Sequence, residues 1–283
     1  MPNSFQKKQV VPYIFNAEKT YKACVEWIKK WFEKNANQNT KAVIGISGGK
    51  DSAVTAKLLV DALGKERVIG VMLPNGEQKD ISDSQAVCDF LDIQHFTINI
   101  KDAYAGLTQE MQYYLPENQY NYQNYSTNTP ARLRMTTLYG IAAVLGNAMV
   151  ANTCNLSEDI MGYSTFYGDS AGSFAPISKL TTDEVVAIGD FAGLPHEITH
   201  KAPSDGMCGK TDEDNLGWTY HEVNELIREN KKGSHYEKII ERWKKNKFKL
   251  EILQLPCFVP DLPLLIEDYP WPANAASNEG KNE

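Results

Sequence analysis

Short apolar runs alternate along the chain with longer stretches in which apolar residues recur every three to four positions. The short runs, rich in β-branched residues, predict buried strands, and the longer stretches predict amphipathic helices. The predicted strands are residues 42–46, 67–73, 94–100 and 148–153. The predicted helices are residues 18–34, 53–63, 80–91, 101–114, 131–146, 181–192, 218–230 and 234–246. Strands that alternate with helices of this length favour an α/β fold with a doubly wound parallel sheet and helices on both faces.

Three polar segments interrupt this pattern. Residues 116–129 are tyrosine-rich and aperiodic, which predicts an exposed loop, and Pro130 is expected to begin the next helix because proline is favoured in a first turn. Residues 162–173 form a second glycine-rich loop. Residues 201–217 form a polar loop of a length at which loops often act as lids.

The first predicted helix, residues 18–34, has a strongly apolar side that includes two tryptophans. Packing against the core of the same chain would account for this side. A surface that faces a second copy of the chain is the more specific hypothesis, because two tryptophans are a large apolar load for a leading helix.

The strand at 42–46 runs directly into the hexapeptide SGGKDS, residues 47–52, which opens a helix. Paired glycines let backbone N–H groups approach an anion closely, and a helix N-terminus adds partial positive charge. Lys50 adds a cation, and Asp51 adds a carboxylate suited to Mg2+. The order strand, glycine turn, helix therefore predicts a phosphate site.

Two widespread phosphate loops do not match this hexapeptide. A Walker A loop requires Ser or Thr directly after Gly-Lys, but Asp51 follows Lys50, and the G-x-G-x-x-G pattern of dinucleotide-binding folds is absent. The hexapeptide instead resembles SGGxDS, the pyrophosphate loop of the N-type ATP pyrophosphatases, which cleave ATP between its α and β phosphates.

Length and composition narrow the class of protein. The 283 residues, 42% of them hydrophobic, suffice for a sizeable core, and we expect a single domain over residues 1–269 with a disordered tail over 270–283. The net charge of −7 does not favour nucleic acid as a partner, and no apolar run is long enough to span a membrane. The five cysteines are scattered, without a C-x-x-C pair, which favours a reducing, cytoplasmic location.

The order and spacing of several motifs identify the chain as similar to the ammonia-dependent NAD synthetases. The matching segments are GISGGKDSAV (45–54), ARLRM (131–135), NTCNLSE (152–158), GYSTFYGD (162–169), PISKLT (176–181), KAPSDGM (201–207) and DEDNLGWTY (212–220). The resemblance implies the adenine nucleotide alpha hydrolase-like fold and a reaction in which ATP adenylates the carboxylate of deamido-NAD. Ammonia then displaces AMP to form NAD, with Mg2+ as cofactor and a homodimer as the assembly.

The resemblance also implies roles for individual residues. The ATP-binding set is Gly45, Ile46, Ser47, Gly48, Gly49, Lys50, Asp51, Ser52, Thr153, Thr182 and Ser204. The set expected to bind deamido-NAD is Arg132, Phe166, Ser173, Trp243 and Lys244. Asp51 and Glu158 match the metal-binding carboxylates, and Asp51 and Lys50 are also expected to act in catalysis. Asp169 is placed to accept a proton from ammonium.

Each of these assignments has a simpler alternative. Glu158 could cap a helix, Asp169 could cap a turn, and Arg134 could be a charge on a helix surface. Lys210 could reach the phosphates from its loop, or could simply be solvated.

Four positions depart from the pattern of the family. Phe166 stands where the family usually has a lysine, and Ser173 where it has an aspartate. The expected His-Lys pair near the C-terminus is best matched by Trp243-Lys244, and a lysine that contacts ATP is replaced by Thr182. The ATP half of the site therefore matches the family more closely than the acceptor half.

These departures leave alternatives to NAD synthesis open. The same adenylation chemistry could act on a different carboxylate, or the chain could be a non-catalytic nucleotide-binding protein. A tRNA-thiolating enzyme fits less well, because the basic surface and paired cysteines that it would need are missing. Nitrogen would come from free ammonia or from a separate partner, since 283 residues leave no room for a glutaminase domain.

Overall fold

A computed structural model describes residues 13–201, 212–252 and 257–266. At its centre lies a four-stranded parallel sheet in the order β3-β2-β1-β4. The strands are β1 (Lys41–Gly45), β2 (Val68–Met72), β3 (Gln94–Thr97) and β4 (Ala148–Val150). All four lie inside the ranges predicted from the apolar runs, except that β1 begins one residue earlier. The doubly wound α/β architecture is therefore confirmed.

Helices surround this sheet and fill the rest of the described chain. The helices before the second glycine-rich loop are α1 (Ala17–Asn35), α2 (Lys50–Leu63), α3 (Ile81–Leu91), α4 (Lys101–Tyr114), α5 (Gln123–Leu145) and α6 (Leu156–Met161). The helices after it are α7 (Thr182–Phe191), α8 (His196–Thr199), α9 (Asp212–Leu216), α10 (Tyr220–Glu229), α11 (Tyr236–Asn246) and α12 (Phe248–Ile252). No helix in the described ranges is long and apolar enough to cross a membrane.

Successive residues of β1 face opposite sides of the sheet, as the alternation of side chains along a strand requires. Ala42 and Ile44 belong to the larger core, which is filled mainly by α1, α2 and α7. Val43 belongs to a second core, in which Met135 and Leu138 of α5 pack on the other face. This continuous burial on both faces explains why the strands appear in the sequence as uninterrupted apolar runs.

The apolar side of α1 is buried within its own chain. Cys24 and Ile28 are completely buried, Phe32 nearly so, and Trp31 stacks on Phe174 with ring centroids 4.6 Å apart. The hypothesis that this side faces a second copy is therefore wrong, because α2, α7 and Phe174 already cover it.

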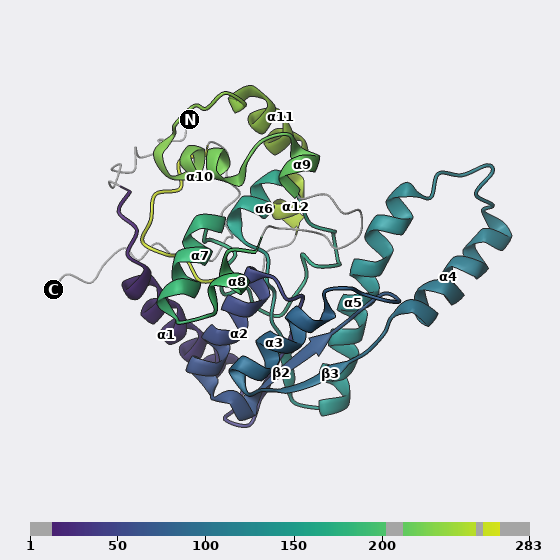
Figure 1. The fold of residues 1–283 in the computed structure, drawn as a ribbon, viewed down its shortest axis with the longest axis horizontal. Coiled ribbons are helices and arrows are strands. Elements are labelled where there is room, and N and C mark those ends of the chain that lie inside the picture. The colour runs from purple at the N-terminus through teal and green to yellow at the C-terminus, as the bar shows by residue number, and fades with distance from the viewer. Residues whose placement is uncertain (1–12, 202–211, 253–256, 267–283) are drawn as a thin grey trace, which may run out of the picture.

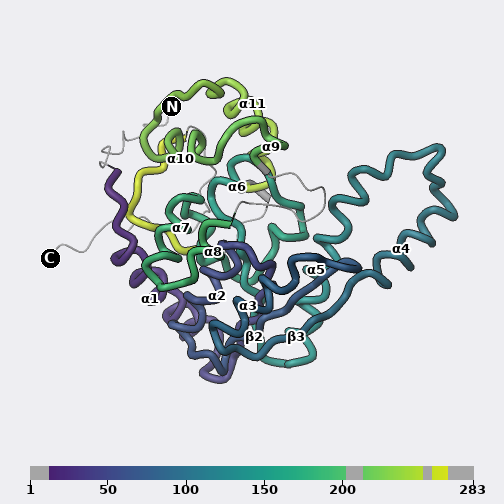
Figure 2. The backbone as a smooth tube through the Cα atoms, in the orientation of Figure 1, coloured from purple at the N-terminus to yellow at the C-terminus, as the bar shows by residue number. Residues whose placement is uncertain are grey.

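Helices α4 and α5 form a hairpin that stands out from the body of the molecule (Figure 1, Figure 2). Two predictions in this region are wrong. Residues 123–129 are helical rather than part of a loop, and Pro130 lies inside α5 rather than at its start. Side chains stabilise this early part of the helix: Ser126 and Thr127 both donate to the carbonyl of Gln123. Sequence patterning missed these turns because they bury little apolar surface.

A third cluster of apolar residues joins α6 to α9, α10 and α11, the group at the top of Figure 1. Trp243 of α11 is 2% exposed within it, among Leu156, Ile160 and Ile239. The loop predicted at 201–217 is only partly described, and its last part is wrong as a loop because residues 212–216 form α9. Residues 202–211 and the expected tail at 270–283 lie outside the described residues.

Candidate active site

The hexapeptide SGGKDS forms a compact turn at the carboxyl end of β1. The Ser52 hydroxyl accepts from the backbone N–H of Ser47 at 3.2 Å and donates to the carbonyl of Gly49 at 3.0 Å. Gly48 has a positive φ of 78°, and an added Cβ would lie 2.8 Å from the backbone nitrogen of Ser84. Only glycine fits there, because both the backbone conformation and the contact with α3 exclude a side chain. The loop is therefore held in one shape by its own hydrogen bonds and by α3.

Lys50 and Asp51 begin α2 immediately after this turn. The Lys50 side chain is only 5% exposed, and its Nζ lies 3.1 Å from Oδ2 of Asp51, which is 17% exposed. An ion pair so well buried needs further polar partners, because a desolvated charge is costly unless it is paired and hydrogen-bonded. Asn155 supplies one: its Nδ2 donates to Oδ1 of Asp51 at 2.9 Å.

Asn155 comes from the segment that follows β4, and it also begins α6. Its Oδ1 accepts from the backbone N–H of Glu158 at 3.1 Å, while Oε2 of Glu158 accepts from the backbone N–H of Asn155 at 3.3 Å. This reciprocal capping box fixes the orientation of both side chains. The parallel sheet thus brings the ends of β1 and β4 together, as the prediction of a shared ligand edge required.

The Glu158 carboxyl lies in a strongly perturbed environment. Desolvation, followed by the negative charge of Asp51, raises the pKa of Glu158 well above its usual range, and the positive charge of Lys50 partly offsets this. Two carboxylates that repel each other in a desolvated site provide the oxygen ligands that a hard divalent cation prefers. No described group of three or more His, Cys, Asp or Glu side chains could hold a metal alone. The pair therefore fits Mg2+, which commonly combines one or two carboxylates with phosphate oxygens and water.

Of the remaining residues predicted to bind ATP, Thr182 joins the same network. Thr182 is buried at the start of α7: its backbone N–H donates to Ser157 Oγ at 3.0 Å, and its Oγ1 lies 3.5 Å from Oδ1 of Asn155. Thr153 is partly exposed between β4 and α6. Ser204 and Lys210 lie outside the described residues, so their assignments stay predictions.

The second glycine-rich loop contacts α5 through residues that are predicted to bind the acceptor. Arg132 Nε donates to the carbonyl of Phe166 at 3.1 Å, which brings together two residues predicted to bind the acceptor. Asp169 is exposed, and its Oδ1 accepts from the backbone N–H of Thr165 at 2.9 Å. Ser173 Oγ accepts from the backbone N–H of Val150 at 3.2 Å, so its hydroxyl already forms a hydrogen bond with the last residue of β4.

The two C-terminal residues predicted to bind the acceptor, Trp243 and Lys244, lie in different environments. Trp243 is buried in the α6–α11 cluster, where it has a packing role, and Lys244 is exposed on α11. Lys249 of α12, which was not predicted, does reach the loop: its Nζ donates to the carbonyls of Gly162 at 2.8 Å and Ser164 at 2.9 Å. Its charge also acts on the carboxyls of Asp169 and Asp159.

Sequence reasoning missed one polar residue near the second glycine-rich loop, Lys249. The short helix α12 has no periodicity of its own, so nothing in the pattern distinguished Lys249 from its neighbours. Asn155 was expected at this edge together with Thr153, Ser157 and Glu158, and its spacing from Glu158 is that of the capping box that the structure shows. Arg134, whose Nε donates to the carbonyl of Leu73 at 2.9 Å, is tied to the end of β2 rather than being a free surface charge.

A model of the NAD synthase family matches residues 20–254. The chain belongs to the NAD synthase family. Curated relatives within it include the NH(3)-dependent NAD(+) synthetase of Pyrococcus furiosus, 38% identical over 213 residues, which are 75% of this chain and 78% of that protein. The NH(3)-dependent NAD(+) synthetase of Methanosarcina acetivorans is 37% identical over 227 residues, which are 79% of this chain and 86% of that protein.

Solved structures of the family superpose on this chain as well. The NMN synthetase from Francisella tularensis superposes with a TM-score of 0.76 and 32% identity, covering 87% of this chain and all of the other. The NH3-dependent NAD synthetase from Campylobacter jejuni superposes with a TM-score of 0.66 and 26% identity, over 87% of this chain and all of the other. These structures, together with the parallel sheet, confirm the adenine nucleotide alpha hydrolase-like fold.

Proposed function

We propose that this chain is an ammonia-dependent, AMP-forming amide synthetase that converts deamido-NAD, ATP and ammonia into NAD, AMP and pyrophosphate. The observation that carries this proposal is the network of Lys50, Asp51, Asn155 and Glu158 beside the glycine turn. It combines phosphate donors, a cation and two carboxylates at one edge of the sheet. Curated relatives with the matching motifs are named as synthetases of this kind.

The chemistry explains why these groups are needed. A carboxylate is a poor electrophile, and in the first step its oxygen attacks the α phosphorus of ATP while the bond to the β-phosphate oxygen breaks. The N–H groups of the glycine turn and the Lys50 ammonium then face growing negative charge, which preorganised donors stabilise. Mg2+, which Asp51 and Glu158 would hold, supplies further charge neutralisation on the phosphate oxygens.

In the second step, ammonia attacks the acyl carbon of the adenylate, and AMP leaves as the amide forms. Ammonia must be unprotonated to attack, so a carboxylate near the acyl group assists by accepting a proton from ammonium. We assign this proton to Asp169, which is exposed at the second glycine-rich loop. Arg132 and Lys249 lie around the same loop, and we assign them to the anionic acceptor.

A direct assay tests the proposal. Purified protein is incubated with ATP, Mg2+, ammonium and deamido-NAD, and pyrophosphate and NAD are both quantified. We expect the two products in equal amounts. Pyrophosphate without NAD would show that ATP is cleaved but that deamido-NAD is not converted to its amide, which would overturn the assignment of the acceptor. The absence of both products would overturn the proposal.

A second acceptor is favoured by a specific observation. The Francisella tularensis structure, with a TM-score of 0.76, is an NMN synthetase. Its product, NMN, lacks the adenylate half of NAD. Phe166 removes a lysine that would attract an additional anionic group of the acceptor. The corresponding acceptor is nicotinate mononucleotide, and the same assay with this compound decides between the two from their ratio of kcat/KM.

Three further features belong to this proposal. Mg2+ is supported by the paired carboxylates Asp51 and Glu158. A cytoplasmic location is supported by the free cysteines Cys24, Cys88 and Cys154, which are all buried without a disulfide. Sedimentation of the purified protein would test the third feature, a homodimer.

The homodimer is supported by the exposed apolar surface of α4 and α5. Val144 is 89% exposed and Tyr113 80%, although both are large apolar side chains. Tyr139 and Leu145 of α5 are further exposed apolar side chains. Exposed apolar area of this kind usually marks a contact with another chain. Because α1 is covered by its own chain, a second copy would pack on α4 and α5 instead.

A further inference from the structure

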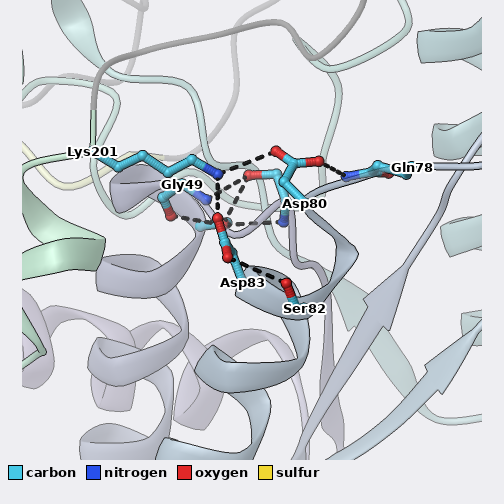
Figure 3. Close-up of polar contacts among 8 residues, drawn as sticks. Gly49, Gln78, Asp80, Ser82, Asp83 and Lys201 are labelled. Atoms are coloured by element: carbon cyan, nitrogen blue, oxygen red, sulfur yellow. Dashed lines mark hydrogen bonds and ion pairs between the residues drawn. The ribbon is translucent and has the colours of Figure 1, made fainter.

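Lys201 forms two ion pairs with the beginning of α3, beside the glycine turn. Its Nζ lies 2.6 Å from Oδ2 of Asp83 and 3.1 Å from Oδ2 of Asp80. Figure 3 shows the Lys201 side chain reaching past Gly49 to both carboxylates. Asp80 is held from its other side as well, since Gln78 Nε2 donates to its Oδ1 at 3.0 Å. Lys201, Asp80, Asp83 and Gln78 were assigned no role in the site above.

Asp83, one of the two residues whose carboxylates pair with Lys201, is also part of the surface on which the glycine turn rests. An added Cβ at Gly48 would lie 2.9 Å from Cβ of Asp83 and 2.8 Å from the nitrogen of Ser84. The turn is therefore in direct van der Waals contact with the first turn of α3. A small movement of this helix end would move Gly48 and the N–H groups beside it.

The other end of the contact, α8, is firmly attached to the body. Thr199 is completely buried, and its Oγ1 donates to Oδ1 of Asp190 at 2.7 Å. An added Cβ at Gly189 would lie 2.6 Å from Cγ2 of Thr199, which shows how closely α7 and α8 pack. Lys201 follows two residues later, so its backbone starts from a rigid base.

We propose that Lys201 is a positioning residue that clamps the first turn of α3 against Gly48 and so fixes the phosphate loop for nucleotide binding. The inference rests on the proposed function, because it takes the glycine turn as the ATP phosphate site. The α3 N-terminus already favours Asp80 and Asp83 through its dipole, so Lys201 is not needed to place these charges there. Lys201 adds the link from α8 to α3 across the loop.

The balance of charge supports a clamp over a direct contact with phosphate. Two carboxylates and one ammonium leave a net negative charge beside an anion site, which by itself would weaken phosphate binding. Hydrogen bonds from Gln78 and Lys201 outweigh desolvation and lower the pKa of Asp80, so this carboxylate stays charged at neutral pH. The ion pairs of Lys201 therefore favour phosphate binding by fixing the shape of the loop, and not by adding positive charge.

Removal of either partner tests the clamp. The affinity for MgATP is measured by calorimetry for the wild type, Lys201→Met, Asp83→Asn and the double variant. We expect each single variant to weaken binding about fivefold, the ratio that corresponds to ~1 kcal/mol for one accessible ion pair. The double variant is expected to be no weaker than the weaker single variant, because both remove the same clamp. Lys201→Arg is expected to restore most of the affinity.

A matched control lies at the opposite end of the same helix. Lys65 pairs with Asp92, the residue that caps the C-terminus of α3. This ion pair lies at the opposite end of α3 from Asp80 and Asp83. Lys65→Met also removes one lysine and one ion pair of α3, and we expect it to leave the MgATP affinity unchanged. A similar melting temperature for Lys65→Met and Lys201→Met would show that overall stability does not explain the difference.

A second measurement does not depend on nucleotide. Hydrogen exchange of peptides that cover residues 46–52 is expected to be faster in Lys201→Met than in the wild type and in Lys65→Met. An unchanged MgATP affinity and exchange rate in Lys201→Met would overturn the clamp. So would tighter binding in Asp83→Asn, since this result would mean that Lys201 acts directly on phosphate. If the wild type binds no MgATP, the proposed function is wrong. In that case the clamp is tested by hydrogen exchange alone, and an unchanged exchange rate in Lys201→Met would overturn it.

Discussion

The two halves of the candidate site differ in how they are built. The ATP half is a short turn between β1 and α2, in which Ser47, Gly49 and Ser52 hydrogen-bond to one another and Lys50 is almost completely buried. The acceptor half is assembled from α5, the second glycine-rich loop and α12, which are far apart in the sequence. Asp169, Arg132 and Phe166 there are exposed or only partly buried.

This difference predicts which parts of the site tolerate substitution. A preorganised turn in which a Cβ at Gly48 collides with the backbone of α3 tolerates few substitutions. Exposed side chains on three separate elements can change one at a time without disturbing the core. The departures from the family pattern at Phe166 and Ser173 lie in this second half.

The largest effect is expected from Asp51 in the ATP half. Asp51→Asn removes a metal ligand and the partner of Lys50, and we expect pyrophosphate release to fall by about 100-fold or more. The matched control is Asp89→Asn, which changes an exposed carboxylate on α3. If Asp51→Asn kept full activity, the conclusion that this half performs the chemistry would be wrong.

Gly48→Ala tests whether the ATP half depends on its exact backbone shape. The positive φ costs about 1–3 kcal/mol for a residue with a side chain, and the collision with Ser84 displaces the turn. We expect the affinity for MgATP to fall by at least about tenfold, measured by calorimetry.

Gly64→Ala is the control for the strain at Gly48. Gly64 also has a positive φ, of 85°, but an added Cβ there would meet nothing within 4 Å. Both variants should lower the free energy of unfolding, and only Gly48→Ala should weaken nucleotide binding. Equal loss of binding in the two variants would mean that lost stability, and not the position of the turn, is responsible.

The acceptor half is expected to respond more weakly. Lys249→Met removes an ammonium group from the second glycine-rich loop, and we expect KM for the acceptor to rise about three- to tenfold with little change in KM for ATP. Lys244→Met, on exposed α11, is expected to leave both values unchanged. Steady-state kinetics in which each substrate is varied would decide, and the opposite result would restore Lys244 as the acceptor ligand.

The last prediction concerns stability as a function of pH and not activity. Desolvation, offset in part by the charge of Lys179, raises the pKa of Asp159 to about 7. The folded protein therefore binds a proton that the unfolded chain has lost, so the free energy of unfolding falls as pH rises from about 4 to about 7. Asp159→Asn removes this titration, and we expect a flatter pH profile in urea denaturation. A profile as steep as that of the wild type would contradict the shift.

The sequence predicted the sheet and the position of the SGGKDS turn between β1 and α2 well, because both depend on local patterns. Buried parallel strands appear as apolar runs, and the SGGKDS turn appears as a contiguous motif. The acceptor half was predicted less well. Lys249 reaches its loop only through the tertiary packing of α12. Trp243 faces the core and has a packing role there, while the assignment of Lys244 stays a prediction.

The same reasoning explains the errors around α5. Its first turns are polar and make side-chain hydrogen bonds such as that of Asn128 to the carbonyl of Asn124. Such turns lack the apolar stripe by which helices are recognised, and Pro130 has the appearance of a helix start.

The side-chain amide of Asn155 couples the unwinding of α6 to the loss of the candidate site. Asn155 uses its oxygen to cap α6 and its nitrogen to hold Asp51. Any fluctuation that unwinds the first turn of α6 must therefore release Asp51 and Glu158 at the same moment. Local melting of a six-residue helix and disassembly of the cation site are then a single cooperative event, so a ligand that bridges the two carboxylates would also protect the backbone of α6.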